Sequence, residues 1–362
     1  MYILILGGYG YTGRLLAKHL LARTNHTVIL AGRNIEKANA YAKELNSDRV
    51  CVRRVDAADA NSLRAGLSSV DFLLVAAPTT HQSETVIQAA FEAGVDYLDV
   101  QFSDAKLASL YKYKDEIREM NLCFVTEAGY HPGLPSAMVR YAAGKLDMIE
   151  SALTAGYLNI GKIPYTEAVD ELMEGFIHYQ AQVFKNGAWT KPGSWDVRKF
   201  DFGSDIGKRD CYSMFFEEMR GLPEMYPTLK NTGFYISGSN WIADLLITPI
   251  VMIGLKLFPK RGIRPLGRLM WWAMGKSKRP YGVALKVEAK GQLNGRQTQV
   301  HARIEHEDGY KLTAIPVVAF LMQYDTIRKS GLHMMGHLAE PIRLFRDMES
   351  MGAKIETSIE SN

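Results

Sequence analysis

Three glycines near the start of the sequence have a spacing that suits nucleotide binding. They follow the pattern G-x-G-x-x-G, in which the first glycine permits a tight turn, the second lets a pyrophosphate approach the backbone, and the third lets a helix pack closely on a strand. Free N–H groups at the start of that helix can then bind phosphates. The predicted dinucleotide-binding residues of this segment are Gly8, Tyr9, Gly10, Tyr11, Thr12 and Gly13.

A basic side chain stands where the adenosine ribose of such a cofactor would lie. In this motif the second strand usually ends near an acidic residue that binds the ribose 2′-hydroxyl. Here residues 27–31 predict the strand, and Gly32, Arg33 and Asn34 follow it. Because a guanidinium forms paired, charge-assisted bonds with phosphate, Arg33 and Asn34 predict NADP, with NAD less favoured. The alternative for Arg33 is an ordinary solvent-exposed charge.

Two later loops should lie at the same edge of the sheet. Residues 50–55 and 71–77 predict strands, and open α/β sheets bind ligands at the carboxyl ends of their strands. Asp56 could contact the adenine or could cap the helix that follows. The loop after the second of these strands should approach the nicotinamide ribose. The candidate cofactor-binding residues of these loops are Asp56, Ala57, Ala77, Pro78 and Thr79.

Three side chains are candidates for proton transfer to or from a substrate: His131, Asp99 and Gln101. His131 lies in a loop after a strand predicted at 122–126, and an imidazole titrates near neutrality. Its alternative role is a structural histidine bonded to the backbone of a tight Pro-Gly turn. Asp99 and Gln101 lie at the end of a strand predicted at 96–100 and are the weaker candidates.

Length and composition describe an ordinary globular protein. The chain has 362 residues, which favours two domains, with 47% hydrophobic and 23% charged residues. A net charge of +4 is too small to indicate a nucleic-acid partner. The three cysteines lack C-x-x-C spacing, so no metal site is predicted and a reducing compartment is expected. The sequence does not begin like a secretory signal, which favours a cytoplasmic protein.

The order of predicted elements indicates an α/β protein. Residues 1–130 alternate strand and helix, which predicts a Rossmann-type doubly wound parallel sheet. Residues 131–330 predict a second, α+β domain for substrate binding or dimerisation, with a mixed or antiparallel sheet. Residues 331–362 are expected to pack back on the first domain, including a strand at 354–359.

Near its end the second domain has the pattern of an antiparallel meander. Residues 283–291, 298–306 and 310–315 predict its three strands. Asn294-Gly295 and Asp308-Gly309 would supply the two turns, since both dipeptides favour tight hairpins.

One stretch, residues 241–281, combines an apolar run with an all-basic charge pattern. No acidic residue occurs between Asp244 and Glu288, whereas lysines and arginines are frequent in this stretch. The apolar run is shorter than the twenty or so residues that span a bilayer, so a transmembrane helix is not expected. It predicts either a buried helix followed by a basic surface helix, or a peripheral contact with an anionic membrane.

The sequence resembles the saccharopine dehydrogenase-like family of NADP-linked oxidoreductases. The resemblance covers most of the chain and is carried by GGYGYTGRLLAKHL, AGR, AAPTTH, DYLDV, EAGYHPGLPSAM and YKLTAIPVVA. It implies a Rossmann domain, a substrate domain and hydride exchange with NADP at a carbon–nitrogen bond. Saccharopine-forming members tend to carry Asp-Pro-Gly where this chain has His131-Pro132-Gly133, which puts an amino-acid substrate in doubt.

The resulting hypothesis is an NADP-dependent oxidoreductase that acts on a C=N bond of a small-molecule substrate. Some members of this broad family reduce lipid-like enoyl chains, so a hydrophobic or lipid-linked enoyl substrate is one alternative. The other is a non-catalytic, membrane-associated protein that binds NADPH. A homodimer is expected, in the cytoplasm or at the membrane periphery.

Overall fold

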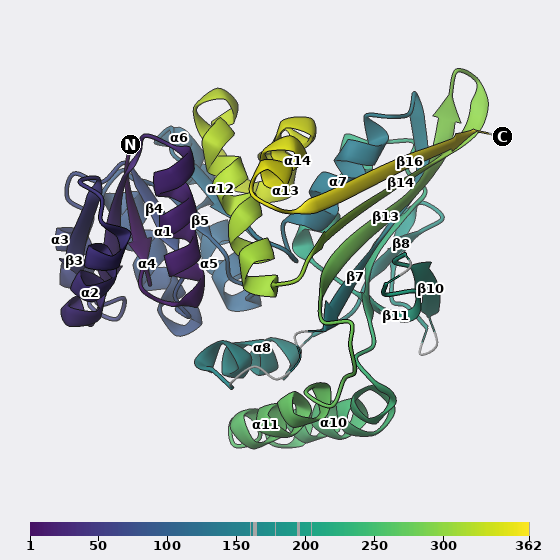
Figure 1. The fold of residues 1–362 in the computed structure, drawn as a ribbon, viewed down its shortest axis with the longest axis horizontal. Helices are drawn as coiled ribbons and strands as arrows, with labels where there is room; N and C mark the ends of the chain where they lie inside the picture. Colours follow the sequence, from purple (N-terminus) through teal and green to yellow (C-terminus); the bar gives the residue numbers. More distant parts are fainter. Residues whose placement is uncertain (160, 162–164, 178, 194–195, 204, 362) are drawn as a thin grey trace. The chain divides into compact units, whose positions relative to one another are not determined.

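The computed structural model describes residues 1–159, 161, 165–177, 179–193, 196–203 and 205–361. The chain forms two units (Figure 1), one of residues 1–130 and 313–348 and the other of residues 131–312 and 349–362. Each unit is built around one β-sheet.

The sheet of the first unit is parallel throughout, in the order β15-β6-β5-β4-β1-β2-β3. Its strands are β1 (Tyr2–Leu6), β2 (Thr27–Gly32), β3 (Val50–Arg54), β4 (Phe72–Val75), β5 (Asp96–Asp99), β6 (Cys123–Thr126) and β15 (Gly331–Met334). The order 3-2-1-4-5-6 of the first six strands is that of a doubly wound sheet, so the predicted Rossmann-type fold is confirmed.

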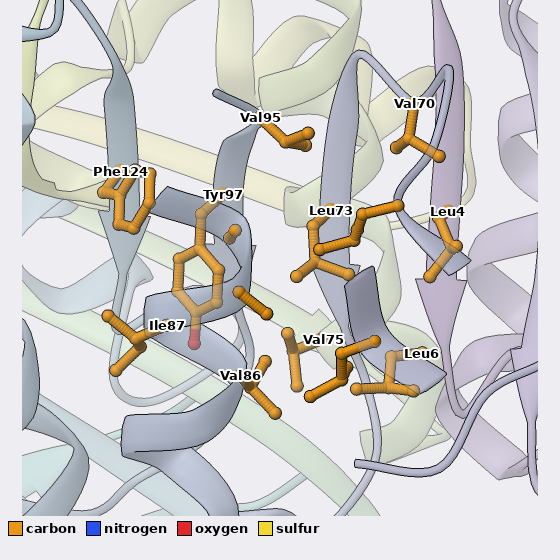
Figure 2. Packing of buried hydrophobic residues seen from close by; sticks show 14 of the residues in the cluster. Leu4, Leu6, Val70, Leu73, Val75, Val86, Ile87, Val95, Tyr97 and Phe124 are labelled. Carbon is orange, nitrogen blue, oxygen red and sulfur yellow. The ribbon is translucent and has the colours of Figure 1, made fainter. Parts of the chain in front are cut away.

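Helices connect these strands. They are α1 (Tyr11–Arg23), α2 (Ile35–Leu45), α3 (Ala60–Gly66), η1 (Thr80–Gln82), α4 (Ser83–Glu92), α5 (Asp104–Lys112) and α6 (Lys114–Glu119), with α12 (Gly309–Ile327), α13 (Met335–Leu338) and α14 (Pro341–Ser350) later in the chain. Apolar strands pack beneath the helices: Leu4 and Leu6 of β1 lie beside Leu73 and Val75 of β4 in the buried core of Figure 2.

The second unit has a mixed sheet, as predicted, in the order β10-β11-β12-β7-β13-β14-β16, with β8 pairing with β12 and β9. Only β7 and β12 pair in parallel among its described strands. The strands are β7 (Met148–Asn159), β8 (Val183–Lys185), β9 (Ala188–Thr190), β10 (Val197–Asp201), β11 (Lys208–Met214), β12 (Asn231–Ser237), β13 (Gly282–Leu293), β14 (Arg296–His306) and β16 (Lys354–Ser361).

The helical elements of the second unit are α7 (Leu134–Ala143), α8 (Glu167–Ile177), η2 (Glu217–Met219), α9 (Leu222–Met225), the π-helix η3 (Ile242–Ile247), α10 (Thr248–Leu257) and α11 (Ile263–Met274). Four of these, α8, η3, α10 and α11, pack on one another and are called the helical module below. The module is connected to one end of the sheet. At this end β7 finishes at Asn159, and β13 begins opposite it at Gly282.

Two expectations for the end of the chain are wrong. Residues 310–315 are not a strand but the start of α12, because the Asp308 carboxylate accepts hydrogen bonds from the N–H groups of Tyr310 and Lys311 and so starts a helix. The expected strand near 354–359 does form, as β16. It pairs with β14 in the second sheet, so only the preceding residues 331–348 lie in the first unit as expected. The Asn294-Gly295 hairpin turn, in contrast, is confirmed, with φ of 51° and 75°.

Candidate functional site

The predicted cofactor residues lie at the point where the strand order of the first sheet reverses. Strand β1 pairs with β2 on one side and with β4 on the other. The loops that follow these strands therefore diverge, and ligands of open α/β sheets bind in the space this leaves. The glycine segment, Arg33 and Thr79 all follow one of these three strands.

The glycine segment makes the tight turn that the motif predicts. Gly10 donates its N–H to the carbonyl of Gly7 at 2.9 Å and forms the N-cap of α1. A Cβ on Gly13 would lie 2.1 Å from the Gly7 oxygen, so a larger residue cannot take this place. The first turn of α1 holds no acidic residue, and its N-cap Gly10 provides no side-chain cap within the described residues. Its start can therefore bind an anion.

Tyr9 links the glycine segment to the end of β2. A Cβ on Gly32 would lie 2.6 Å from the Tyr9 ring, and the Tyr9 hydroxyl accepts a hydrogen bond from the Asn34 N–H at 2.9 Å. The Asn34 side chain accepts from the Lys37 N–H and caps α2. Asn34 thus orders the loop that carries Arg33. Tyr11 is largely exposed, and Thr12 is half-buried.

Three arginines near this edge differ in how they are held. The Arg14 guanidinium contacts the Tyr9 carbonyl, the Glu44 carboxylate and the Tyr41 ring. Arg33 is exposed at the end of β2. Arg54, which the sequence reasoning missed, is exposed and pairs in register with Gly32. Arg33 and Arg54 are thus both exposed at the ends of adjacent strands, whereas Arg14 supports the framework.

Asp56 organises its own loop. Its carboxylate accepts a hydrogen bond from the Ala58 N–H at 3.0 Å, and its N–H donates to Ser62. The cap of the following helix is Asp59, not Asp56. Asp56 is half-buried, and Ala57 packs against the core of the first unit.

Gln101 holds the loop that follows β4. Its side-chain amide donates to the Ala77 carbonyl at 2.9 Å and to the Thr79 hydroxyl at 3.1 Å. Thr79 is buried and Pro78 exposed. The bonds of Gln101 therefore fix the backbone of the loop predicted from the sequence to approach the nicotinamide ribose.

Asp99 belongs to a buried network. It accepts hydrogen bonds from the Lys106 ammonium at 2.8 Å and from the Thr126 hydroxyl at 2.8 Å. The side chains of Asp99 and Lys106 are both 0% exposed, and Lys106 also donates to the Gln101 carbonyl. This network links the carboxyl ends of β5 and β6. The sequence reasoning missed Lys106; the only signal was its position in the first turn after Ser103, the N-cap of α5.

A buried carboxylate follows β6. Glu127 is 1% exposed and has a φ of 50°, a backbone conformation uncommon for residues other than glycine. Such conformations concentrate at functional sites.

His131 lies in an aromatic environment within the second unit. Its ring stacks on Phe216 with centroids 6.0 Å apart, and Phe234 lies at 5.9 Å. Burial lowers the pKa of His131 to about 4, so the imidazole is neutral at pH 7. At that pH the ring carries no imidazolium proton to donate and is only a weak base.

A second carboxylate, Glu218, supports the His131 loop. It accepts hydrogen bonds from the N–H groups of Gly133 at 2.7 Å and Ser136 at 3.1 Å. Gly133 has a φ of 123°, which favours glycine, and it forms the N-cap of α7. Burial raises the pKa of Glu218 to about 7, against the opposing effect of these hydrogen bonds. The sequence reasoning missed Glu218, since its partners lie more than 80 positions away.

Comparison with known proteins agrees with this architecture. Residues 3–125 match the family model described as the saccharopine dehydrogenase NADP binding domain. The chain is 26% identical to carboxyaminopropylagmatine dehydrogenase of Synechocystis over 249 residues, which cover 64% of this chain but only 61% of that protein. It is 24% identical to carboxynorspermidine synthase of Vibrio cholerae, over 92% of this chain and 88% of that protein. The fold matches that of saccharopine dehydrogenase (L-Glu forming) from Saccharomyces cerevisiae with a TM-score of 0.68, at 14% identity over 99% of both chains.

Proposed function

We propose that this chain is an NADP-dependent oxidoreductase acting on a carbon–nitrogen bond, because residues 3–125 match the saccharopine dehydrogenase NADP binding domain and the fold is that of a saccharopine dehydrogenase. The observation that carries the proposal is the glycine turn before α1, with Arg33 at the adjoining strand end. The first can bind a pyrophosphate and the second a 2′-phosphate.

The residues present suit the cofactor. NADPH, when bound, supplies a hydride, and the protein supplies position and a proton. The N–H groups at the start of α1 would hold the pyrophosphate, and Arg33, with Arg54 nearby, would bind the 2′-phosphate. Gln101 orders the Ala77–Thr79 backbone.

The substrate class comes from the relatives. Carboxyaminopropylagmatine dehydrogenase and carboxynorspermidine synthase are both named for carboxylated amines. We extend this class to the present chain: reduction of an imine adds one hydride and one proton and gives a secondary amine. His131 is the sequence-based candidate for proton transfer, but its lowered pKa of about 4 leaves it unprotonated at pH 7 and disfavours it as the proton donor of the reductive direction.

A panel of substrates tests this proposal. NADPH oxidation should occur with mixtures of 2-oxo acids or aldehydes and amines, which form imines in solution. Turnover only with enoyl chains would replace the proposal with the hydrophobic-substrate alternative, which the exposed apolar helices of the second unit favour. Tight NADPH binding without turnover on either panel would favour a protein that binds the cofactor without catalysis.

A single substitution tests the assignment of Arg33 to the 2′-phosphate of NADP. Arg33→Asp should weaken NADPH binding by roughly ten- to a hundredfold, because a charge-assisted pair is lost and a like charge gained. NADH binding should change little. Arg14→Gln is the matched control. It should weaken the binding of NADPH and of NADH to the same extent, because Arg14 supports the Tyr9 backbone. Equal losses of NADPH and NADH with Arg33→Asp would contradict the role of Arg33.

A further inference from the structure

Helix α10 is apolar on two sides, only one of which is covered within the described residues. On the covered side, Val251 and Leu255 pack on Val169 and Met173 of α8. These four side chains are the buried core of the helical module. A globular helix ordinarily needs one apolar side and keeps the other polar. The apolar character of the second side therefore requires a separate explanation.

The second side forms a continuous exposed surface. Its residues recur every three or four positions along α10 and continue at both ends of the helix, so they share one face. Their side chains are 49% to 67% exposed. They are Trp241, Leu245, Leu246, Ile250, Ile253, Leu257 and Phe258, called the apolar face below. Adjoining exposed apolar residues of this number mark an interaction site in a soluble protein.

Cations border the apolar face. All eight lysines and arginines of residues 245–281 are exposed, although Arg264 pairs with Asp170 of α8 at 3.5 Å, and the sequence holds no acidic residue between Asp244 and Glu288. They are Lys256, Lys260, Arg261, Arg264, Arg268, Lys276, Lys278 and Arg279. Arg268 and Trp272 lie on α11 and Lys276 lies in the turn just after it, and the Lys276 ammonium is 5.1 Å from the Trp272 ring centroid. Tryptophan beside basic residues is typical of membrane interfaces.

The helices are too short to cross a bilayer. Among the described residues, no helix is both long and apolar enough to do so. Both α10 and α11 can instead lie along a surface, with apolar side chains inserted and cations at the headgroups.

We propose that the helical module docks the protein on a membrane surface that contains anionic lipids. The apolar face enters the boundary between headgroups and acyl chains, and the basic residues bind the headgroup phosphates and carboxylates. Charge decides between this surface and a second copy of the chain. Two copies would bring one set of eight cations against another, whereas an anionic bilayer complements both the charge and the apolar residues.

Sedimentation with vesicles tests the proposal. The full-length protein should sediment with phosphatidylcholine vesicles that contain phosphatidylserine, much less with phosphatidylcholine alone, and less in high salt. Ile253→Glu with Leu257→Glu should lower the bound fraction at least about tenfold, since two charges would have to enter the bilayer boundary. A combined charge reversal at Lys256, Lys260 and Arg261 should lower the phosphatidylserine-dependent share of vesicle binding by a similar factor.

Matched variants separate docking from general surface effects. Ile342→Glu changes an isoleucine of 58% exposure, close to the 59% of Ile253, but lies on α14. Charge reversal at Lys43, Lys114 and Lys290 matches the triple change, because these lysines are also exposed. Both controls should sediment like the unchanged protein, and all variants should bind NADPH equally.

Two results would overturn the proposal. One is the absence of sedimentation with phosphatidylserine vesicles at low salt. The other is a dimer in light scattering that the Ile253→Glu, Leu257→Glu variant converts to a monomer, because the apolar face would then be covered by a second copy.

Discussion

Two titratable side chains, His131 in the loop before α7 and the buried Glu218 that supports this loop, have pKa values displaced in opposite directions. The pKa of His131 falls from 6.5 to about 4, and that of Glu218 rises from 4.5 to about 7. In both cases burial disfavours the charged form. The folded protein therefore binds fewer protons at His131 and more at Glu218 than the unfolded chain does.

These displacements predict a compensated dependence of stability on pH. The contribution of Glu218 to the unfolding free energy is full below pH 4.5 and is lost as the pH rises to about 7. The contribution of His131 has the opposite sign and increases between about pH 4 and 6.5. Each amounts to about 3 kcal/mol at most, so the two nearly cancel between about pH 4.5 and 6.5.

Single variants should remove this compensation, as urea unfolding across pH 4–8 would show. Relative to the unchanged protein, His131→Gln should make stability fall as the pH rises toward 7. Glu218→Gln should instead make stability rise toward pH 6.5. Parallel curves for all three proteins would show that neither group titrates as assigned.

At the scale of elements, α5 carries two lysine ion pairs in contrasting settings. Lys106, near its start, is buried with Asp99, whereas Lys112, at its end, pairs with Glu84 in solvent. Removing one partner of a buried pair leaves an uncompensated charge, which costs about 3–5 kcal/mol. Exposed pairs contribute little.

Lys106→Met should therefore lower the unfolding free energy strongly, and Lys112→Met on the same helix should hardly change it. Adding Asp99→Asn to Lys106→Met should restore part of the loss, because the unpaired charge is removed. Urea unfolding of the three variants measures this. A similar small effect of both lysines would show that the network contributes nothing to stability.

The elements of the first sheet could be predicted from the sequence because their signals are local. The apolar run of β1, the glycine turn and the start of α1 are contiguous. The start of α12 was misread since Asp308-Gly309 suits a hairpin as well as a helix cap. Lys106 and Glu218 could not be assigned, because each role depends on partners that only the folded chain brings near.

At the scale of the whole molecule, the chain keeps its chemistry-bearing residues and its apolar surface on different elements. Cofactor candidates follow the strands of the first sheet, whereas the apolar face belongs to insertions in the second. The apolar run and the basic charge of residues 241–281 can both be read directly from the sequence. It could not show which apolar side chains are covered, since apolar residues occupy two sides of α10.

Part of the helical module can be deleted, because the two strands that flank it both pair with β7. Strand β12 ends beside β7, where Ile236 pairs with Gly156, and β13 begins beside the same strand, where Gly282 pairs with Asn159. A short glycine-serine bridge from Ser237 to Gly282 would thus replace η3, α10 and α11 without moving either strand. Such a shortened protein should retain its NADPH affinity and lose its binding to vesicles. That result would identify η3, α10 and α11 as a membrane anchor separable from the rest of the protein.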